Sequence, residues 1–526
     1  MTAPTTHPVH ESWSIRKPAV CAAGGIVASQ HHLASRIGAG VLEAGGNAVD
    51  AAVTAGLAIG AVEPWMSGLG GGGFMVVYVA AERRAYAVEF GMCASHGIDP
   101  AAYPLAEGVD TDLFGWPAVV GDRNVLGPLS IAVPGLVAGH AAALERFGTR
   151  SWRDAIAPAV ELAQQGMTVD WYATLKIASE AASLARFPET ARVYLPGGHV
   201  PAPGWGGSAP VIRLGALGQT LARLRDAGPR DFYEGEIARR IVRDCNDAGS
   251  PLSAADLAGY AARIVGADRH RYRDALVHAA PGLSAGPTLR HALSLLAERV
   301  VPSGGTPDAG AYLAYASCLL DAWDHRLATM GDPDDSAAPG CTTHLSVADR
   351  DGNVVALTQT LLSIFGSRVV LPGTGILMNN GMMWFDPRPG RPNSIAPGKR
   401  PLSNMCPTVV ERSDGLRFAA GASGGRRIMP AVFQLVSFLV DYPMTMDDAM
   451  HVPRIDASGE PLVTADPALP AGVIDALAER HEVQVAPHGV YPAFYANPNL
   501  AGCEAGGMTV GAACVTSPWA RAVGAP

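Results

Sequence analysis

The chain has 526 residues, of which 48% are hydrophobic and 17% are charged, so it can bury a large core. Its 39 basic and 48 acidic residues give a net charge of −9, and no basic stripe runs along it, which argues against nucleic acid as a partner. No stretch reaches the ~20 apolar residues of a membrane helix. Residues 1–20 are polar and lack the apolar core of a secretory signal, so we expect a cytoplasmic protein.

The cysteines and histidines give no pattern of a metal or disulfide site. The eight cysteines are scattered without a Cys-x-x-Cys pair, which fits reduced thiols in a cytoplasm. The fifteen histidines form no ligand constellation, since neighbours such as His31 and His32 diverge by ~100° on a helix. We therefore expect neither a metal nor another cofactor.

The first 166 residues alternate between strand and helix signals. Residues 24–63 predict a short strand and two helices, with Asn47 capping the second helix, which is Ala-rich and nearly uncharged and is therefore expected to be buried all round. A glycine-rich run at 67–73 precedes an apolar strand at 74–79. Residues 133–166 predict two amphipathic helices.

The remainder divides into two parts. Residues 170–330 read as mainly helical, and strands dominate from 343 to about 422. Helices at 427–440 and 446–451 and a helix–strand pair at 471–485 follow. The composition changes near 331–342, which divides a helix-rich part of 341 residues from a strand-rich part of 185 residues.

The glycine-rich run at 67–73 could cradle a phosphate, which would make the chain a nucleotide-binding enzyme. A phosphate-binding loop, however, follows a strand and opens a helix, whereas this run precedes a strand. We therefore favour close backbone approach in a core or beside a site.

The tripeptide Thr342-Thr343-His344 stands where a loop becomes a strand. Residues 344–353 and 354–360 predict two strands joined by an Asp-Gly-Asn turn. Scission after Cys341 would give Thr342 both a hydroxyl nucleophile and a free α-amine with a pKa of roughly 7.7–8.0, which can act as its base. Since the amine supplies the base, we expect His344 to be structural.

Two further segments carry groups suited to acyl chemistry. Gly424 and Gly425 lie between a predicted strand and a helix that starts near Ile428, where backbone N–H groups could form an oxyanion hole. Residues 399–404 (KRPLSN) could hold a carboxylate through Ser403 and Asn404, or could form a solvated turn.

Together these segments resemble the γ-glutamyltransferase family of N-terminal nucleophile hydrolases. The matching motifs keep their order along nearly the whole chain. They include 46–52 (GNAVDAA), 67–74 (SGLGGGGF), 133–139 (VPGLVAG), 342–346 (TTHLS), 375–380 (GILMNN) and 399–403 (KRPLS).

The resemblance implies an α+β fold, a four-layer αββα sandwich, made by one self-cleaving precursor. It implies scission between Cys341 and Thr342 into a large chain, 1–341, and a small chain, 342–526, that remain entwined. It also implies the site roles: Thr342 as nucleophile, Thr360 as its hydrogen-bonding threonine, Gly424 and Gly425 as oxyanion hole, and Ser403 with Asn404 as substrate contacts.

Several positions depart from the family pattern. Gly91 stands where γ-glutamyl-specific members carry an arginine for the substrate carboxylate, and Leu362 replaces an asparagine. The family's Asn-Asn-Gln-Met-Asp-Asp run is 379–384 (NNGMMW), so Gly381 and Trp384 replace polar ligands of the γ-glutamyl head group. Without those partners, a zwitterionic head group should bind weakly. Arg426, Arg368 or Arg400 could supply a replacement charge.

The sequence thus predicts an enzyme that cleaves a small-molecule amide through a threonine acyl-enzyme, with transfer to water or an amine. One alternative is an acylase or amidohydrolase of non-γ-glutamyl amides, resembling cephalosporin acylase or oxamate hydrolase. A second is a non-catalytic binding relative. The sequence leaves the acceptor and any higher oligomer open.

Overall fold

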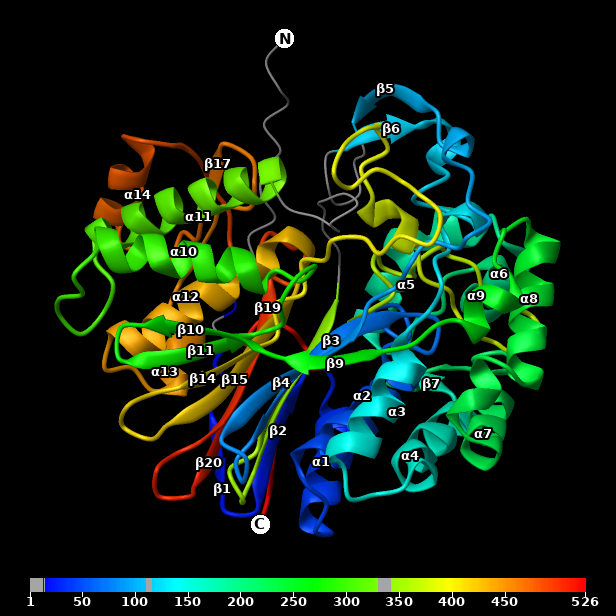
Figure 1. Cartoon of the computed structure of the whole chain (residues 1–526), viewed down its shortest axis with the longest axis horizontal. Coiled ribbons are helices and arrows are strands. Elements are labelled where there is room, and N and C mark those ends of the chain that lie inside the picture. The colour runs from blue at the N-terminus through cyan, green and yellow to red at the C-terminus, as the bar shows by residue number, and fades with distance from the viewer. Residues whose placement is uncertain (1–12, 14, 110–115, 330–341) are drawn as a thin grey trace.

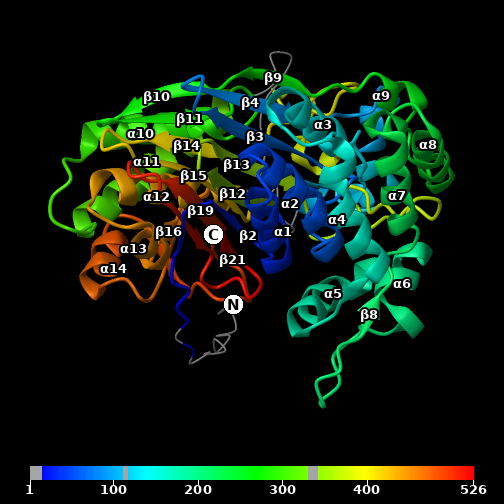
Figure 2. The same ribbon diagram turned by 90° about the horizontal axis from the view of Figure 1, so that it is seen from below.

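Two antiparallel sheets stacked face to face form the centre of the molecule. The computed structural model describes residues 13, 15–109, 116–329 and 342–526. Within these residues, each of the two large sheets has seven strands. Figure 2 shows the sheets between two layers of helices, with α1 and α2 outside one sheet and α11 and α12 outside the other. This arrangement confirms the expected αββα sandwich.

We call these sheets the first and the second sheet. The first runs in the order β1 (Val20–Ala22), β20 (Thr509–Ala513), β19 (Asn497–Cys503), β15 (Arg417–Ser423), β14 (Thr408–Glu411), β11 (Ala275–Ala279) and β10 (Asp268–Tyr272). The second runs in the order β21 (Arg521–Ala525), β2 (Gly25–Ser29), β12 (Thr343–Asp349), β13 (Val354–Thr360), β3 (Gly72–Val79), β4 (Arg84–Phe90) and β9 (Arg263–Gly266).

The helices flank the sheets and extend beyond them (Figure 1). The second sheet packs on α1 (His32–Glu43), α2 (Ala48–Val62) and α3 (Leu136–Phe147), and the first on α10 (Gly286–Arg299), α11 (Ala309–Thr329) and α12 (Ile428–Asp441). Beside the second sheet lie α4 (Trp152–Gln165), α5 (Trp171–Leu184), α6 (Pro188–Tyr194), α7 (Leu217–Ala227), α8 (Glu236–Ala248) and α9 (Ala254–Ala258).

Short elements complete the described chain. Beside the first sheet lie α13 (Met446–His451) and α14 (Ala471–Ala478), with a small sheet of β16 (Ile455–Asp456), β17 (Leu462–Ala465) and β18 (Glu482–Val485). Two further ribbons pair β5 (Leu105–Val109) with β6 (Pro117–Val119) and β7 (Met167–Thr168) with β8 (Val211–Ile212). No helix among the described residues is long and apolar enough to cross a membrane.

Strand alternation divides the core into layers. On β12, Leu345 and Val347 face the cluster formed with α1, α2 and α3, whereas Ala348 joins the cluster between the two sheets. On β15, Phe418 and Ala420 face α12, and Ala419 faces the second sheet. Because successive side chains of a strand point to opposite faces, both sheets are buried on both sides.

Both sheets contain strands from both predicted chains. β12 pairs with β2 on one side and with β13 on the other, and β13 pairs with β3. In the first sheet, β11 pairs with β14 and β1 with β20. The parts before and after residue 341 therefore share one fold and one hydrogen-bonded framework.

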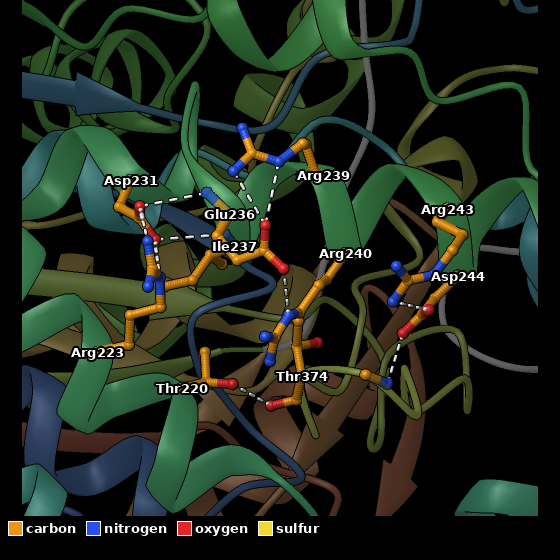
Figure 3. Close-up of polar contacts among 11 residues, drawn as sticks. Thr220, Arg223, Asp231, Glu236, Ile237, Arg239, Arg240, Arg243, Asp244 and Thr374 are labelled. Carbon is orange, nitrogen blue, oxygen red and sulfur yellow. Dashed lines mark hydrogen bonds and ion pairs between the residues drawn. The ribbon is translucent and has the colours of Figure 1, made fainter.

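Hydrogen bonds also connect residues that follow position 341 to the outer helices α7 and α8. The Thr220 hydroxyl of α7 donates to the carbonyl of Thr374 over 2.7 Å, and Asp244 of α8 accepts the backbone N–H of Gly373 over 2.6 Å (Figure 3). These bonds hold the loop around residue 374 against α7 and α8.

Many local predictions are confirmed, and several strands were missed. Asn47 accepts from the N–H groups of Val49 and Asp50 and caps α2 in a full capping box. The β12–β13 hairpin joined through its Asp-Gly-Asn turn is present. In contrast, β9, β10 and β11 interrupt the region read as mainly helical, and residues 361–407 carry no strand longer than an isolated bridge.

Candidate active site

Thr342 lies directly before β12 and is fully buried. The register of the hairpin pairs Thr343 with Gln359, so one further step places Thr342 opposite Thr360. Among the described residues, the Oγ1 of Thr342 is buried without a hydrogen-bond partner. The proposed scission partner, Cys341, lies outside the described residues. A buried hydroxyl that has no structural partner is available for another role.

Successive side chains at the start of β12 face two different environments. The Thr343 hydroxyl points outward to the end of α2, where it donates to Glu63 over 3.3 Å. Burial raises the pKa of the Glu63 carboxyl to about 8. By alternation, Thr342 and His344 share the opposite face, toward the first sheet. The sequence did not predict the contact between Glu63 and Thr343, which spans 280 positions of the chain.

His344 is a structural residue of the space between the sheets. Its Nδ1 and Nε2 lie 2.8 Å and 2.9 Å from the hydroxyls of Thr358 and Ser346. Burial lowers the pKa of His344 to about 3, so the ring is neutral at physiological pH. These partners occupy both ring nitrogens, in agreement with the structural role expected from the sequence.

Thr360 ends β13 beside the glycine-rich loop. Its Oγ1 accepts the N–H of Leu362 over 2.7 Å. An added Cβ on Gly71 would lie 2.1 Å from the Thr360 carbonyl oxygen. The glycine-rich loop therefore lets two backbones touch next to the site, which is the interpretation favoured from the sequence over phosphate binding.

Gly424 and Gly425 lie at the same end of the sandwich as Thr342. Gln30, which follows β2 and continues its register beside His344, donates to the Asn497 carbonyl over 3.0 Å and to the Ser423 hydroxyl. Ser423 ends β15, and α12 follows three residues after Gly425. Gly424 has φ of +136°, and an added Cβ there would lie 2.8 Å from Ala496 Cα, so glycine is needed.

Ser403 and Asn404 lie on a fully buried loop near α11. The Ser403 N–H donates to the Leu283 carbonyl over 2.6 Å, and the Ser403 carbonyl accepts from Arg326 over 2.8 Å. Both polar side-chain atoms of Asn404 are buried and have no hydrogen-bond partner among the described residues. Of the two, Asn404 therefore has the amide free to meet a ligand.

The residues that depart from the family pattern meet in one apolar cluster. Leu362, Met382, Met383 and Trp384 are at most 1% exposed and pack in the same cluster as Trp116. Gly381 adjoins it, since a Cβ there would lie 2.7 Å from Ala132 Cβ. Gly91 is half-buried, and its carbonyl accepts from Tyr260 and Arg400.

Two asparagines position this cluster. Asn379 accepts from the N–H groups of Ala132 and Gly381 and donates to the carbonyls of Gly70 and Ala132. Asn380 accepts from the N–H of Ser363 and donates to the Val125 carbonyl. These hydrogen bonds hold the loop after β13, and the segment before the 3₁₀ turn Gly381–Trp384, against the loops around Gly70, Val125 and Ala132.

The structure distinguishes the three arginines suggested by the sequence. Arg368 pairs with Glu180 over 3.0 Å, and Arg400 donates to the carbonyls of Gly91 and Ala261. Arg426 directly follows Gly425, and its Cζ lies 5.9 Å from the ring centroids of both Trp116 and Trp323. Arg426 is therefore next to the apolar cluster.

The described residues contain no group of three or more His, Cys, Asp or Glu arranged to hold a metal. The chemistry that the site offers is that of a buried hydroxyl, a glycine turn at the N-terminus of a helix, and an apolar wall with arginine beside it. This combination suits acyl transfer, in which a nucleophile attacks a carbonyl and backbone N–H groups stabilise the oxyanion.

Comparisons with known proteins identify the family of the chain. The sequence profile of the family described as Gamma-glutamyltranspeptidase matches residues 34–341 and 335–493. The chain is 32% identical to the "Acylase ACY 1 proenzyme" of Pseudomonas sp. (strain V22), an alignment that covers 100% of this chain and 97% of the relative. It is 28% identical to the "Glutathione hydrolase proenzyme" of Bacillus subtilis (strain 168), over 86% of this chain and 84% of the relative.

A solved structure supports the fold. The cephalosporin acylase from Bacillus halodurans superposes with a TM-score of 0.85 at 22% identity and covers 98% of each chain. The profile match, the full-length relative and the layered architecture lead to one conclusion: the chain belongs to the gamma-glutamyltranspeptidase family of N-terminal nucleophile hydrolases.

Proposed function

We propose that Thr342 is the nucleophile of a self-processing amide hydrolase that acts on acyl amides other than γ-glutamyl amides. One observation carries the proposal. The Thr342 hydroxyl is buried without a partner among the described residues, opposite Thr360 and at the same end of the sandwich as Gly424 and Gly425.

Maturation would produce the nucleophile. The Thr342 oxygen attacks the carbonyl carbon of Cys341 and displaces the Thr342 nitrogen, which takes up a proton and becomes the free α-amine. Water then hydrolyses the resulting ester, leaving Cys341 with a carboxylate and restoring the hydroxyl. The products are the chains 1–341 and 342–526, held together by the shared sheets.

Turnover would repeat this chemistry on a substrate. The α-amine of Thr342 accepts the hydroxyl proton as the oxygen attacks the substrate amide, and the leaving amine receives that proton. Backbone N–H groups at Gly424 and Gly425 would stabilise the oxyanion, a contribution of roughly 10²–10³ in turnover for one donor. Water or an amine then takes the acyl group from the threonine.

The apolar cluster supports the shift in acyl specificity. Leu362, Gly381 and Trp384 bring no polar group that could pair with an α-ammonium, and Gly91 brings no side chain for an α-carboxylate. A site without those partners gains little from a γ-glutamyl head group. A relative that aligns over the whole chain carries the name acylase, which supports the same proposal.

Intact mass spectrometry of the purified protein tests the proposal. Fragments of 341 and 185 residues are expected, and the smaller fragment should gain the mass of the acyl group from simple acyl p-nitroanilides. Thr342→Ala should leave one unprocessed, inactive chain, whereas Thr342→Ser, which keeps a hydroxyl, should still process. Processing and turnover that survive Thr342→Ala would disprove the proposal, and fast turnover of only the γ-glutamyl anilide would disprove the specificity.

We also propose that the enzyme works in the cytoplasm. Cys245, Cys318 and Cys406 are buried as free thiols, which agrees with a reducing compartment. Fractionation of the source cells tests this placement, and recovery of the protein outside the cytoplasmic fraction would overturn it.

A further inference from the structure

One turn of the chain supports the strand ends that carry Thr342 and Thr360. The turn comprises residues 63–66, directly after α2, and the Met66 N–H closes it by donating to the Glu63 carbonyl over 3.1 Å. The Met66 carbonyl accepts the N–H of Leu361, the residue after Thr360, over 2.9 Å. The end of β13 is therefore tied to the end of α2.

The side chain of Glu63 ties the start of β12 to the same turn. The Thr343 hydroxyl donates to the Glu63 carboxyl over 3.3 Å, and the two residues are 0% and 2% exposed. Among the described residues, this hydroxyl is the only hydrogen-bond partner of the carboxyl. A buried carboxyl with so few partners costs free energy on folding, so stability alone does not account for it.

The outer face of the hairpin is held at a second, adjacent point. Gln359 pairs with Thr343 across the two strands. Its Nε2 donates to the Gly56 carbonyl of α2 over 2.7 Å and to the Ser67 hydroxyl of the glycine-rich loop over 3.0 Å. The outer-facing residues 343 and 359 are thus both anchored. By alternation, their neighbours 342 and 360 face the first sheet.

An anchor at Thr343 acts on Thr342 through the backbone. The two residues share one planar peptide group, so fixing the Thr343 side chain restricts the orientation of that plane. The plane in turn restricts the direction of the Cα–Cβ bond of Thr342 and the position of its hydroxyl. A misplacement of about 1 Å can cost about 10²-fold in rate, so one hydrogen bond behind a nucleophile can matter.

We propose that Glu63 is a positioning residue that acts through the Thr343 hydroxyl and orients the Thr342 hydroxyl for self-cleavage and turnover. This inference rests on the proposed function of Thr342. Glu63 touches neither the substrate nor the reacting atoms, because it lies on the outer side of β12. Its loss should therefore lower kcat and leave KM nearly unchanged.

The carboxyl is mainly neutral at pH 7. Burial raises its pKa to about 8, although Lys176 and the hydrogen bond from Thr343 act in the opposite direction. Lys176 and Tyr172, both of α5, are the titratable groups that face it. An amide has the shape of a neutral carboxylic acid, so Glu63→Gln keeps an acceptor for Thr343. Glu63→Leu removes the acceptor and keeps an apolar side chain of comparable bulk.

Rates of self-cleavage and of pentanoyl-p-nitroanilide hydrolysis test the role. Self-cleavage is followed on denaturing gels during cell-free synthesis, so that the precursor is seen before it matures. Glu63→Leu should slow self-cleavage and lower kcat by roughly 10- to 100-fold, whereas Glu63→Gln should keep most of both rates. Wild-type rates in Glu63→Leu, equal losses in the two variants, or a loss confined to KM would overturn the proposal.

A double-mutant cycle shows whether Glu63 acts through Thr343. Thr343→Val removes the hydroxyl, should slow both reactions as Glu63→Leu does, and should add nothing to it in the double variant. Thr220→Val is the matched control, because the Thr220 hydroxyl bonds the Thr374 carbonyl instead, and it should keep wild-type rates. Losses at 63 and 343 that multiply would overturn the proposal. Thr343→Val probes the same bond if Glu63→Leu fails to fold, and wild-type rates in it would likewise overturn the proposal.

The two proposals fail in different ways. A wild-type protein that neither cleaves itself nor takes up an acyl group rejects Thr342 as the nucleophile, together with the role of Glu63 that rests on it. Normal cleavage and acylation in the wild type, in Glu63→Leu and in Thr343→Val would keep Thr342 as the nucleophile and reject the positioning role.

Discussion

His344 on β12 lies directly against Gly421 on β15, so that a Cβ added to Gly421 would be 2.2 Å from the ring Cε1. The contact joins the two sheets next to the candidate nucleophile. Burial in this contact keeps the imidazole of His344 neutral. The hydroxyls of Thr358 and Ser346 hold the ring in position. Glycine at 421 is the condition for this packing.

Gly421→Ala should therefore destabilise the protein by about 1–3 kcal/mol, the usual cost of overpacking a core. Gly472→Ala is the matched control, since Gly472 lies exposed in α14 with nothing within 4 Å of an added Cβ. The control should be neutral or stabilising, because alanine favours helices. Chemical denaturation of both variants makes the comparison, and equal midpoints for the two would contradict the steric argument.

Glu63 should make stability depend on pH. Burial raises the pKa of its carboxyl to about 8 from the usual 4.5, although Lys176 and the hydrogen bond from Thr343 act in the opposite direction. Tyr172 is the other titratable group that faces it. Between these pH values, the folded protein keeps a proton that the unfolded chain releases, so stability falls as pH rises, by about 1.4 kcal/mol per unit for one group.

Glu63→Gln removes this titration and should flatten the fall in unfolding free energy between pH 4.5 and 8. Glu479→Gln, at an exposed position after α14, serves as the control and should keep the wild-type slope. The measurement is urea unfolding across that pH range. A slope in Glu63→Gln that matches the wild type would show that the carboxyl does not hold the proton.

Leu362 should help to set acyl preference through the apolar cluster. It has φ of +90°, a region that asparagine tolerates better than other non-glycine residues, so Leu362→Asn should keep the backbone. The new amide should lower kcat/KM for pentanoyl-p-nitroanilide roughly ten-fold, because it places a polar group where we propose that the acyl chain packs. Leu362→Met, which keeps an apolar chain of similar volume, should lose less. Equal losses in both variants would point to strain rather than polarity.

The two processed chains should not separate under native conditions. Each large sheet pairs strands from before residue 341 with strands from after it, so dissociation would break both sheets and expose their cores. Size-exclusion chromatography should give one native species that contains both fragments, and only denaturant should separate them. Two native peaks would contradict the shared framework.

The local elements that sequence alone predicted well have strong local signals. α2 has an N-cap at Asn47 and a long apolar run, and the β12–β13 hairpin has alternating strands around an Asp-Gly-Asn turn. The glycine-rich run before β3 and the composition change near 331–342 were equally visible. These features depend on residues that are neighbours in sequence.

The missed elements depend on distant partners. β10 carries the polar sequence DRHRY at a sheet edge, and its neighbour β11 pairs with β14 more than a hundred residues later. Residues 361–407 were expected to lie within a region of strands. Their loops are instead held by hydrogen bonds from Asn379 and Asn380 to loops that precede residue 341. Neither set of contacts leaves a periodic pattern in the sequence.

The sequence by itself determined the family, the layered fold class and the threonine that is predicted to act, because each of these is written in short ordered motifs. Only the tertiary structure decided which partners the charged side chains have. It paired Arg368 with Glu180, brought Glu63 behind Thr343, and placed Arg326 beside Arg426. The reason is physical: the burial and the partners of a charge depend on which distant segments pack around it, and that packing is a property of the whole fold.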